Sequence, residues 1–198
     1  MEKRRLTIDV ITYAAVGLLD EVGLDDLSTR RLAARLDVQS PTLYWHVKNK
    51  AALLDLVAEA ICADAFDIDA TAPWRDQLTS GLRQFRALLT AHRDAAALLR
   101  ARPPGPARLA HIETTVGILL EAGFSPDDAA AISRLLAAHV LDSVPARQPG
   151  DPGPVIARMA DYPNLARVGP AFGRLSDSDL FELGVEVILD GLEQRLLR

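Results

Sequence analysis

Cysteine is almost absent from this sequence. Cys62 is the only one among 198 residues, so no disulfide can form within the chain. Small secreted folds that depend on disulfides are therefore excluded, and we expect the protein to act in the cytoplasm. Cys62 lies in a stretch rich in Ala and Leu, where a small buried thiol is expected rather than a redox sensor.

Long apolar runs are also missing. No run approaches the roughly 20 residues that a membrane-spanning helix needs. The chain starts with the basic segment Met1–Arg5, but Asp9, Asp20 and Glu21 soon follow, which does not fit the uniform apolar core of a signal peptide. With 49% hydrophobic and 25% charged residues, the composition is that of a soluble globular protein, and we expect no membrane partner.

Aromatic residues make up only 5% of the chain, and neither strand-like alternation nor an internal repeat is present. Leu and Ala dominate instead, which favours helices. The sequence therefore predicts an all-α fold of nine or ten helices. We expect a helix-turn-helix domain in residues 1–66, built on three helices with a fourth behind them, and a larger helical domain in residues 67–198.

Capping residues and apolar residues at helical spacing predict where the helices begin and end. Thr7, Ser28 (or Thr29), Asn49 and Ser125 are placed to cap helix starts, and Gly23 is placed to end the first helix. Residues 145–175 hold six of the 12 prolines and cannot form one long helix. The predicted helices are 8–22, 29–36, 40–46, 50–65, 75–92, 95–101, 107–122, 126–144, a short one at 155–160, and one from 179 to the end.

Charge is distributed unevenly along the chain. The net charge is −5, yet residues 1–50 carry eight Lys and Arg against seven Asp and Glu, a balance of +1. Basic residues in this part cluster at 3–5, 30–35 and 48–50. Local basic patches on an acidic protein fit binding to a specific nucleic-acid site better than general binding to polyanions.

Residues 28–50 have the pattern of two short helices separated by a tight turn at 37–39. Ser40-Pro41 can open the second helix, with the Ser hydroxyl as cap and Pro at the first helical position. This helix is crowded with hydroxyl, aromatic and basic groups, which suit a helix that lies in the major groove of double-stranded DNA. We expect Arg30, Lys48 and Lys50 to bind phosphates, and Gln39, Ser40, Thr42, Tyr44, Trp45 and His46 to reach base edges, thymine methyls or sugars.

The segments Leu27–Ala33 and Ser40–Leu54 resemble the tetracycline-repressor (TetR) family, above all in the run PTLYWHVKNK. The similarity is tight over residues 7–60 and looser beyond, at 85–89, 93–94, 121–125 and 191–193. The resemblance implies a homodimer with two DNA-reading heads and a ligand pocket in each body. It also implies that an effector moves the heads apart so that they leave a palindromic operator, with repression as the usual outcome. The DNA-contacting set that it implies is Arg30, Thr42, Tyr44, Trp45, His46 and Lys50.

Two positions in the helix-turn-helix depart from the family pattern. Ser40 stands where the tetracycline repressor has a glutamine, and a hydroxyl cannot make the bidentate contact to adenine that an amide makes. We therefore expect a different operator. Asp37 occupies the turn position usually held by glycine, and it tolerates a left-handed backbone better than most residues do.

The positions that bind the drug and its magnesium in the family are also changed. By motif position, its two anchoring histidines correspond to Phe66 and to Leu98 or Leu99, and a glutamine that contacts the drug corresponds to Thr115. We therefore expect no metal or cofactor, and a small, more apolar effector than tetracycline–magnesium. Arg102 resembles a position where the family's chain moves on induction. The candidate effector-binding residues are Phe66, Phe85, Leu89, Leu99, Arg102, Ile112, Thr115, Val116, Leu136 and His139. Most could equally be core residues. His111 and His139 could be polar anchors of the ligand or ordinary core or surface histidines.

The last predicted helix is apolar over more than one face and needs partners on two sides. Together with the alanine-rich helix 126–144 it could form the family's four-helix dimer interface. The alternative is a terminal helix buried within one subunit. The candidate interface residues are Leu135, Phe181, Val185, Ile188 and Leu192.

An enzyme and an interaction protein that does not use DNA are the two other function classes. Asp25-Asp26 and Asp127-Asp128 are carboxylate pairs at loops or helix starts, where the helix dipole stabilises acids. Four scattered histidines and one cysteine form no catalytic constellation, so we expect no enzyme. A helical interaction protein that does not use DNA is the remaining alternative, which DNA binding would exclude.

Overall fold

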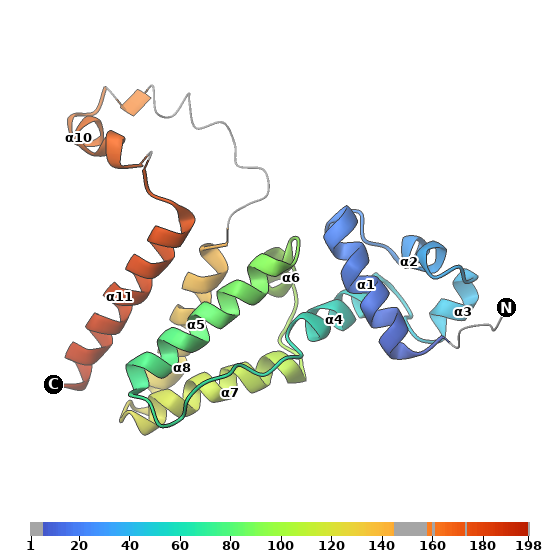
Figure 1. The fold of residues 1–198 in the computed structure, drawn as a ribbon, viewed down its shortest axis with the longest axis horizontal. Coiled ribbons are helices and arrows are strands. Elements are labelled where there is room, and N and C mark those ends of the chain that lie inside the picture. The colour runs from blue at the N-terminus through green and yellow to red at the C-terminus, as the bar shows by residue number, and fades with distance from the viewer. Residues whose placement is uncertain (1–5, 145–157, 160, 173, 198) are drawn as a thin grey trace.

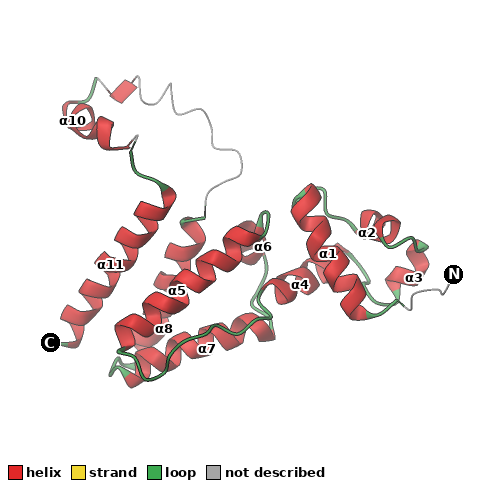
Figure 2. Cartoon of the chain, in the orientation of Figure 1, coloured by secondary structure: helices red, strands yellow, loops and turns green. Residues whose placement is uncertain are grey.

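The computed structural model describes residues 6–144, 158–159, 161–172 and 174–197. All regular structure in these ranges is helical, which confirms the all-α fold (Figure 2). No helix among the described residues is long and apolar enough to cross a membrane. The helices are α1 (Ile8–Val22), α2 (Thr29–Arg35), α3 (Ser40–Tyr44), α4 (Lys50–Ile61), α5 (Trp74–Ala91), α6 (Ala95–Ala101), α7 (Pro106–Glu121), α8 (Pro126–Asp142), α10 (Pro163–Phe172) and α11 (Asp177–Leu196).

Side-chain caps begin five of the helices, α1, α2, α4, α8 and α11. Thr7, Ser28, Asn49 and Ser125 each accept a hydrogen bond from a backbone N–H in the first turn of the helix that follows. Ser176 and Asp179 form a reciprocal capping box at the start of α11. Each such cap stabilises its helix by about 1 kcal/mol, because it satisfies a donor that has no partner within the helix.

Two predicted features of the helices are wrong. Gln39, not Ser40, is the cap residue of α3. Pro41 therefore stands at the second helical position, where its missing N–H costs no intrahelical hydrogen bond. Helix α4 ends at Ile61, which leaves Ala65 exposed in a connecting segment. That segment is drawn out of helical geometry by tertiary hydrogen bonds, from His111 to the carbonyl of Asp64 and from Gln84 to the carbonyl of Asp67.

The proline-rich region contains a helix that the sequence did not predict. Helix α10 has Pro170 inside it and no buried residue. Proline in its last turn removes one donor but does not prevent a short helix. Of the helix expected at 155–160, all but two residues lie outside the described residues.

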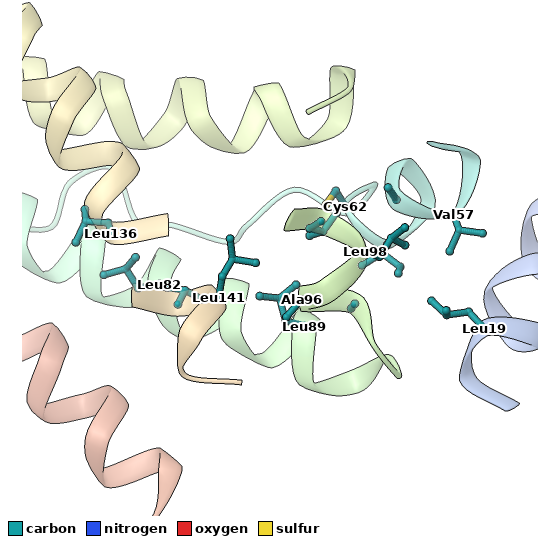
Figure 3. Close-up of a cluster of buried hydrophobic side chains, with 14 of the residues drawn as sticks. Leu19, Val57, Cys62, Leu82, Leu89, Ala96, Leu98, Leu136 and Leu141 are labelled. Atoms are coloured by element: carbon teal, nitrogen blue, oxygen red, sulfur yellow. The ribbon is translucent and has the colours of Figure 1, made fainter. Parts of the chain in front are cut away.

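A continuous apolar core joins the N-terminal helices to the rest. Leu19 of α1 and Val57 of α4 are fully buried, and Leu98 of α6 and Leu89 of α5 continue the core into the larger part of the molecule (Figure 3). Helix α4 packs against α1 on one side and against α6 and α7 on the other. It therefore connects α1–α3, which lie at the end of the molecule far from α11, to the body formed by α5–α8 and α11 (Figure 1).

Cys62 lies in this core, with 1% of its surface exposed. Burial raises the pKa of its thiol from 9.0 to about 11, with Arg108 lowering it and Glu59 raising it to lesser extents. The folded protein thus keeps the proton, whereas the unfolded chain loses it near pH 9, so the stability contribution is present below the unfolded pKa and is lost as the pH rises toward about 11.

We expect the free energy of unfolding to fall by on the order of 2 kcal/mol more in the native protein than in Cys62→Ala as the pH rises across this window. Denaturant melts of both proteins at successive pH values measure the difference. Parallel curves for the two proteins would contradict the burial of an ionisable thiol.

Candidate DNA interface and effector cavity

The turn between α2 and α3 is closed by backbone hydrogen bonds. Val38 N–H donates to the carbonyl of Ala33 and Asp37 N–H to that of Ala34, the pattern of a Schellman motif. Asp37 has a φ of 53°, the left-handed conformation that favours glycine. Asp is among the few other residues that adopt it readily, so the turn forms although glycine is absent.

Helix α3 is held by two apolar anchors and exposes the rest of its side chains. Leu43 and Val47 are 1% and 2% exposed, while Trp45 is 86% exposed. An indole left in solvent gains nothing for folding, which favours a contact role. The structure places all nine predicted DNA-binding residues at the surface: Arg30, Gln39, Ser40, Thr42, Tyr44, Trp45, His46, Lys48 and Lys50.

The basic residues of this region differ in their partners. Arg31 forms an ion pair with Asp26, and Arg35 forms one with Glu21, so both charges are neutralised within the protein. Lys50 donates from Nζ to the carbonyl of Asp25 at 3.3 Å. Arg30 and Lys48 form no ion pair with any described residue and are available for phosphates.

Polar contacts join the end of α1 to the loop between α5 and α6. The carboxylate of Asp20 accepts from the backbone N–H of Arg93 at 2.9 Å and lies 3.0 Å from His92 Nδ1. Asp94, itself left-handed with a φ of 57°, accepts from the N–H of Leu24 at 3.0 Å. We call Asp20, Leu24 and His92–Asp94 the joint, because they connect the N-terminal helices to the body.

An apolar cavity lies between α5, α7 and α8. It contains ≈ 640 Å³ of non-atom space, a volume that includes open solvent at its mouth. Phe66 stacks on the ring of His111 with centroids 3.9 Å apart, and Phe85 lies 6.2 Å from Phe66. Five of the predicted effector-binding residues line this cavity: Phe66, Phe85, Ile112, Thr115 and Leu136.

The other five predicted effector-binding residues lie elsewhere. Leu89 and Leu99 are 0% and 2% exposed and belong to the core, and the partly buried Val116 packs against that core. Arg102 forms a bidentate ion pair with Asp55 of α4, at 2.7 and 2.9 Å. His139 bonds to the carbonyl of Phe181 at 3.0 Å, so it joins α8 to α11.

The sequence did not predict the polar lining residues Gln77, Arg108 and Ser133, whereas the candidate polar anchor His111 does line the cavity. The signal was present in the helical spacing, because Arg108, His111, Ile112 and Thr115 follow one another at three- and four-residue intervals on α7. Apolar lining residues of α5 and α8 follow the same rule. The lining residues not predicted are Ile68, Gln77, Leu78, Gly81, Leu82, Arg108, Ile118, Ser133 and Ala137.

Helix α11 buries the face that the sequence assigned to the dimer interface. Phe181, Val185 and Leu192 are at most 6% exposed within the single chain, and Ile188 is half-buried. Gly184 lies directly against the ring of His139, so this glycine serves the contact between α8 and α11 within the subunit. Periodicity could not separate the two apolar faces of this helix. Exposed apolar residues instead occupy the opposite face and the neighbouring part of α8: Leu180, Leu183, Val187 and the predicted Leu135.

Comparisons with known proteins agree with this geometry. Residues 11–57 match the family model "Bacterial regulatory proteins, tetR family", and residues 69–196 match "Tetracyclin repressor-like, C-terminal domain". The tetracycline repressor protein class A from transposon 1721 of Escherichia coli is 37% identical, over 98% of this chain and 93% of the relative. An HTH-type transcriptional regulator of Saccharopolyspora erythraea is 36% identical, over 96% of this chain and 86% of the relative.

A solved structure agrees over the whole length. The TetR family protein ActR of Streptomyces coelicolor, in complex with actinorhodin, superposes with a TM-score of 0.85 at 32% identity and covers 97% of this chain and 99% of ActR. The two family models thus cover residues 11–57 and 69–196, and the relatives match this chain over nearly its full length. The chain belongs to the TetR family of ligand-responsive, DNA-binding transcriptional regulators.

Proposed function

We propose that this regulator represses transcription from a palindromic operator and is released from it by a small, largely apolar effector in the α5–α7–α8 cavity. One observation carries the proposal: α7 forms a wall of the cavity and also packs against α4, which holds the DNA-reading helices. A ligand that displaces α7 therefore acts directly on the helix that positions the head.

The chemistry of the cavity argues against tetracycline–magnesium as the effector. Magnesium needs oxygen ligands in near-octahedral geometry. Phe66 and Thr115 line the cavity at two positions that bind the drug complex in the tetracycline repressor, and Leu98 and Leu99 are buried in the core. Among the described residues, no three His, Cys, Asp or Glu side chains lie close enough to hold a metal ion.

We also propose that the protein has no catalytic activity and acts in the cytoplasm, where it meets chromosomal DNA. The Asp127-Asp128 pair serves structure, because Asp128 bonds to Arg195 and to the Ser125 hydroxyl. The hydrogen bond from Arg195, followed by that from Ser125, holds the pKa of Asp128 below its usual value. A carboxylate committed in this way is unsuited to proton transfer near neutral pH.

For assembly, we propose that α8 and α11 meet their copies in a second subunit through the exposed apolar face defined by Leu135, Leu180, Leu183 and Val187. Ala131 and Ala138 are exposed beside Leu135 on α8, and such small side chains allow helices to approach closely. The dimer then places two heads for two half-sites, about one helical turn of DNA apart. We place the boundary between head and body after residue 66.

Two measurements on one complex test the proposed function. Selection from random duplex DNA should recover an inverted repeat that the purified protein binds with nanomolar affinity, in the range typical of specific regulators. Tetracycline with Mg²⁺ should leave this complex intact. Recovery of no common sequence would favour an interaction protein that does not use DNA, and release by micromolar tetracycline–Mg²⁺ would refute the effector proposal.

The joint predicts how the head and the body communicate. Replacing Asp20 by alanine removes the acceptor for the Arg93 N–H and the partner of His92. The end of α1 then loses these two contacts with the body. We expect the ratio of operator Kd with and without effector to fall at least about fivefold, since allosteric coupling is typically worth 1–3 kcal/mol. Asp9→Ala, on the same helix but away from the joint, is the control. Fluorescence anisotropy of labelled operator measures the ratio, and an unchanged ratio in Asp20→Ala would exclude this route.

A further inference from the structure

Most of the N–H and O–H groups in the wall of the cavity already donate hydrogen bonds to other atoms of the protein. Gln77 donates from its amide nitrogen to the carbonyls of Ala70 and Ala72, at 3.4 and 2.8 Å. The Ser133 hydroxyl donates to the carbonyl of Ala130 at 3.0 Å. Both side chains therefore offer the cavity an oxygen that can only accept.

The same holds for two polar lining residues of α7, Thr115 and His111. The Thr115 hydroxyl donates to the carbonyl of His111 at 3.0 Å. His111 Nε2 lies 2.9 Å from the carbonyl of Asp64, and a carbonyl can only accept, so Nε2 carries the proton. In the neutral ring this leaves Nδ1 as an acceptor, and Nδ1 is buried without a partner among the described residues.

Arg108 is the exception among the polar lining residues. Its Nη1 donates to the carbonyls of Leu99 and Arg102, while Nε and Nη2 have no partner among the described residues. Burial lowers the pKa of this guanidinium from its usual value, and no described carboxylate pairs with it. A partly buried cation without a carboxylate partner favours an anionic or strongly polarised oxygen.

We propose that the cavity selects a metal-free, flat aromatic ligand that carries several hydroxyl groups and one acidic oxygen, with the hydroxyls donating to the acceptors of the wall and the acidic oxygen accepting from Arg108. The remaining walls are apolar and bring Leu78, Leu82 and Phe85 against the ring system. The stacked pair Phe66 and His111 provides a flat aromatic surface. This inference rests on the proposed function, since it names the class of effector for the same cavity.

Four related compounds separate the contributions: a dihydroxyanthraquinone carboxylate, the anthraquinone carboxylate without hydroxyls, the dihydroxyanthraquinone without carboxylate, and unsubstituted anthraquinone. Isothermal titration of the full-length protein, without metal, should give the lowest Kd for the first. Removing either the hydroxyls or the carboxylate should raise Kd about tenfold or more, the usual value of hydrogen bonds to charged or buried partners.

Two variants assign these losses to residues. His111→Phe keeps an aromatic ring against Phe66 and should abolish most of the advantage of the hydroxyl groups. Arg108→Met keeps the length of the side chain and should abolish the advantage of the carboxylate. Because a general change in the fold would weaken all four compounds alike, the ratios between compounds report the contacts themselves.

The outcomes distinguish this inference from the proposed function. Equal Kd values for all four compounds, or tightest binding of plain anthraquinone, would overturn the inference and leave a ligand-released repressor intact. The expected order without any release of operator DNA would support the inference and refute the proposed function. Binding of none of the four to the folded protein would overturn the inference, whereas release of operator by another apolar compound would still support the function.

Discussion

Val187→Glu is expected to convert the dimer into a monomer and to raise the Kd for operator DNA at least about a hundredfold. Val187 is 61% exposed in the single chain, so a charge there costs little in folding. In the dimer the same position is expected to be covered by the second subunit, where an unpaired carboxylate is costly. Loss of the dimer uncouples the two heads, and linked binding of two modules typically contributes a factor of 10²–10⁴ in affinity.

Leu109→Glu is the matched control for this variant. Leu109 is 50% exposed, apolar and helical like Val187, but it lies on α7, away from the proposed interface. Light scattering after size exclusion should give a dimer for the native protein and for Leu109→Glu, and a monomer for Val187→Glu. A dimeric Val187→Glu that binds operator normally would mean that subunits meet elsewhere.

The double substitution of Tyr44 and His46 by alanine is expected to raise the operator Kd at least about a hundredfold, because each direct base contact contributes about 1–3 kcal/mol. Both side chains are exposed, and the anchors Leu43 and Val47 remain in place. The melting temperature, the dimer and the Kd for an effector should therefore remain unchanged. Fluorescence anisotropy measures the operator Kd, differential scanning fluorimetry the melting temperature, and titration the Kd for an effector.

The dependence of binding on salt tells base contacts from phosphate contacts in this variant. If Tyr44 and His46 contact bases, their substitution should weaken specific binding and leave the slope of log Kd against log salt nearly unchanged. The slope depends on the number of phosphates that the protein neutralises, and that number stays the same. Equal losses for operator and random DNA would assign the two side chains to the backbone instead.

Local chemistry explains why the N-terminal half was predictable from sequence. Thr7, Ser28 and Asn49 act through hydrogen bonds to their own helices, so their caps follow from residues three positions apart. The turn at Asp37 is likewise closed by nearby backbone groups. Buried Leu43 and Val47 fix which face of α3 is exposed, and the predicted DNA-binding residues all lie on the surface.

The body was less predictable because its site depends on how distant helices meet. An apolar stripe shows which face of a helix is buried, but it does not show whether that face meets neighbouring atoms or an empty space. Leu89 and Leu99 fill the core, whereas Phe85 and Leu136 border the cavity, although all four have the same chemical character. Helix α11 adds a second ambiguity, since it has apolar residues on both the buried and the exposed side.

The exposed α3 helix is expected to read a specific DNA site as part of a dimer. Footprinting on the DNA that flanks the protein's own gene tests it most directly. We predict protection of two inverted half-sites whose centres lie about 10 base pairs apart or a multiple of that spacing, by the native protein but not by the Tyr44 and His46 double variant. Absence of any protected site with the folded, dimeric native protein at low salt and without effector would contradict the claim.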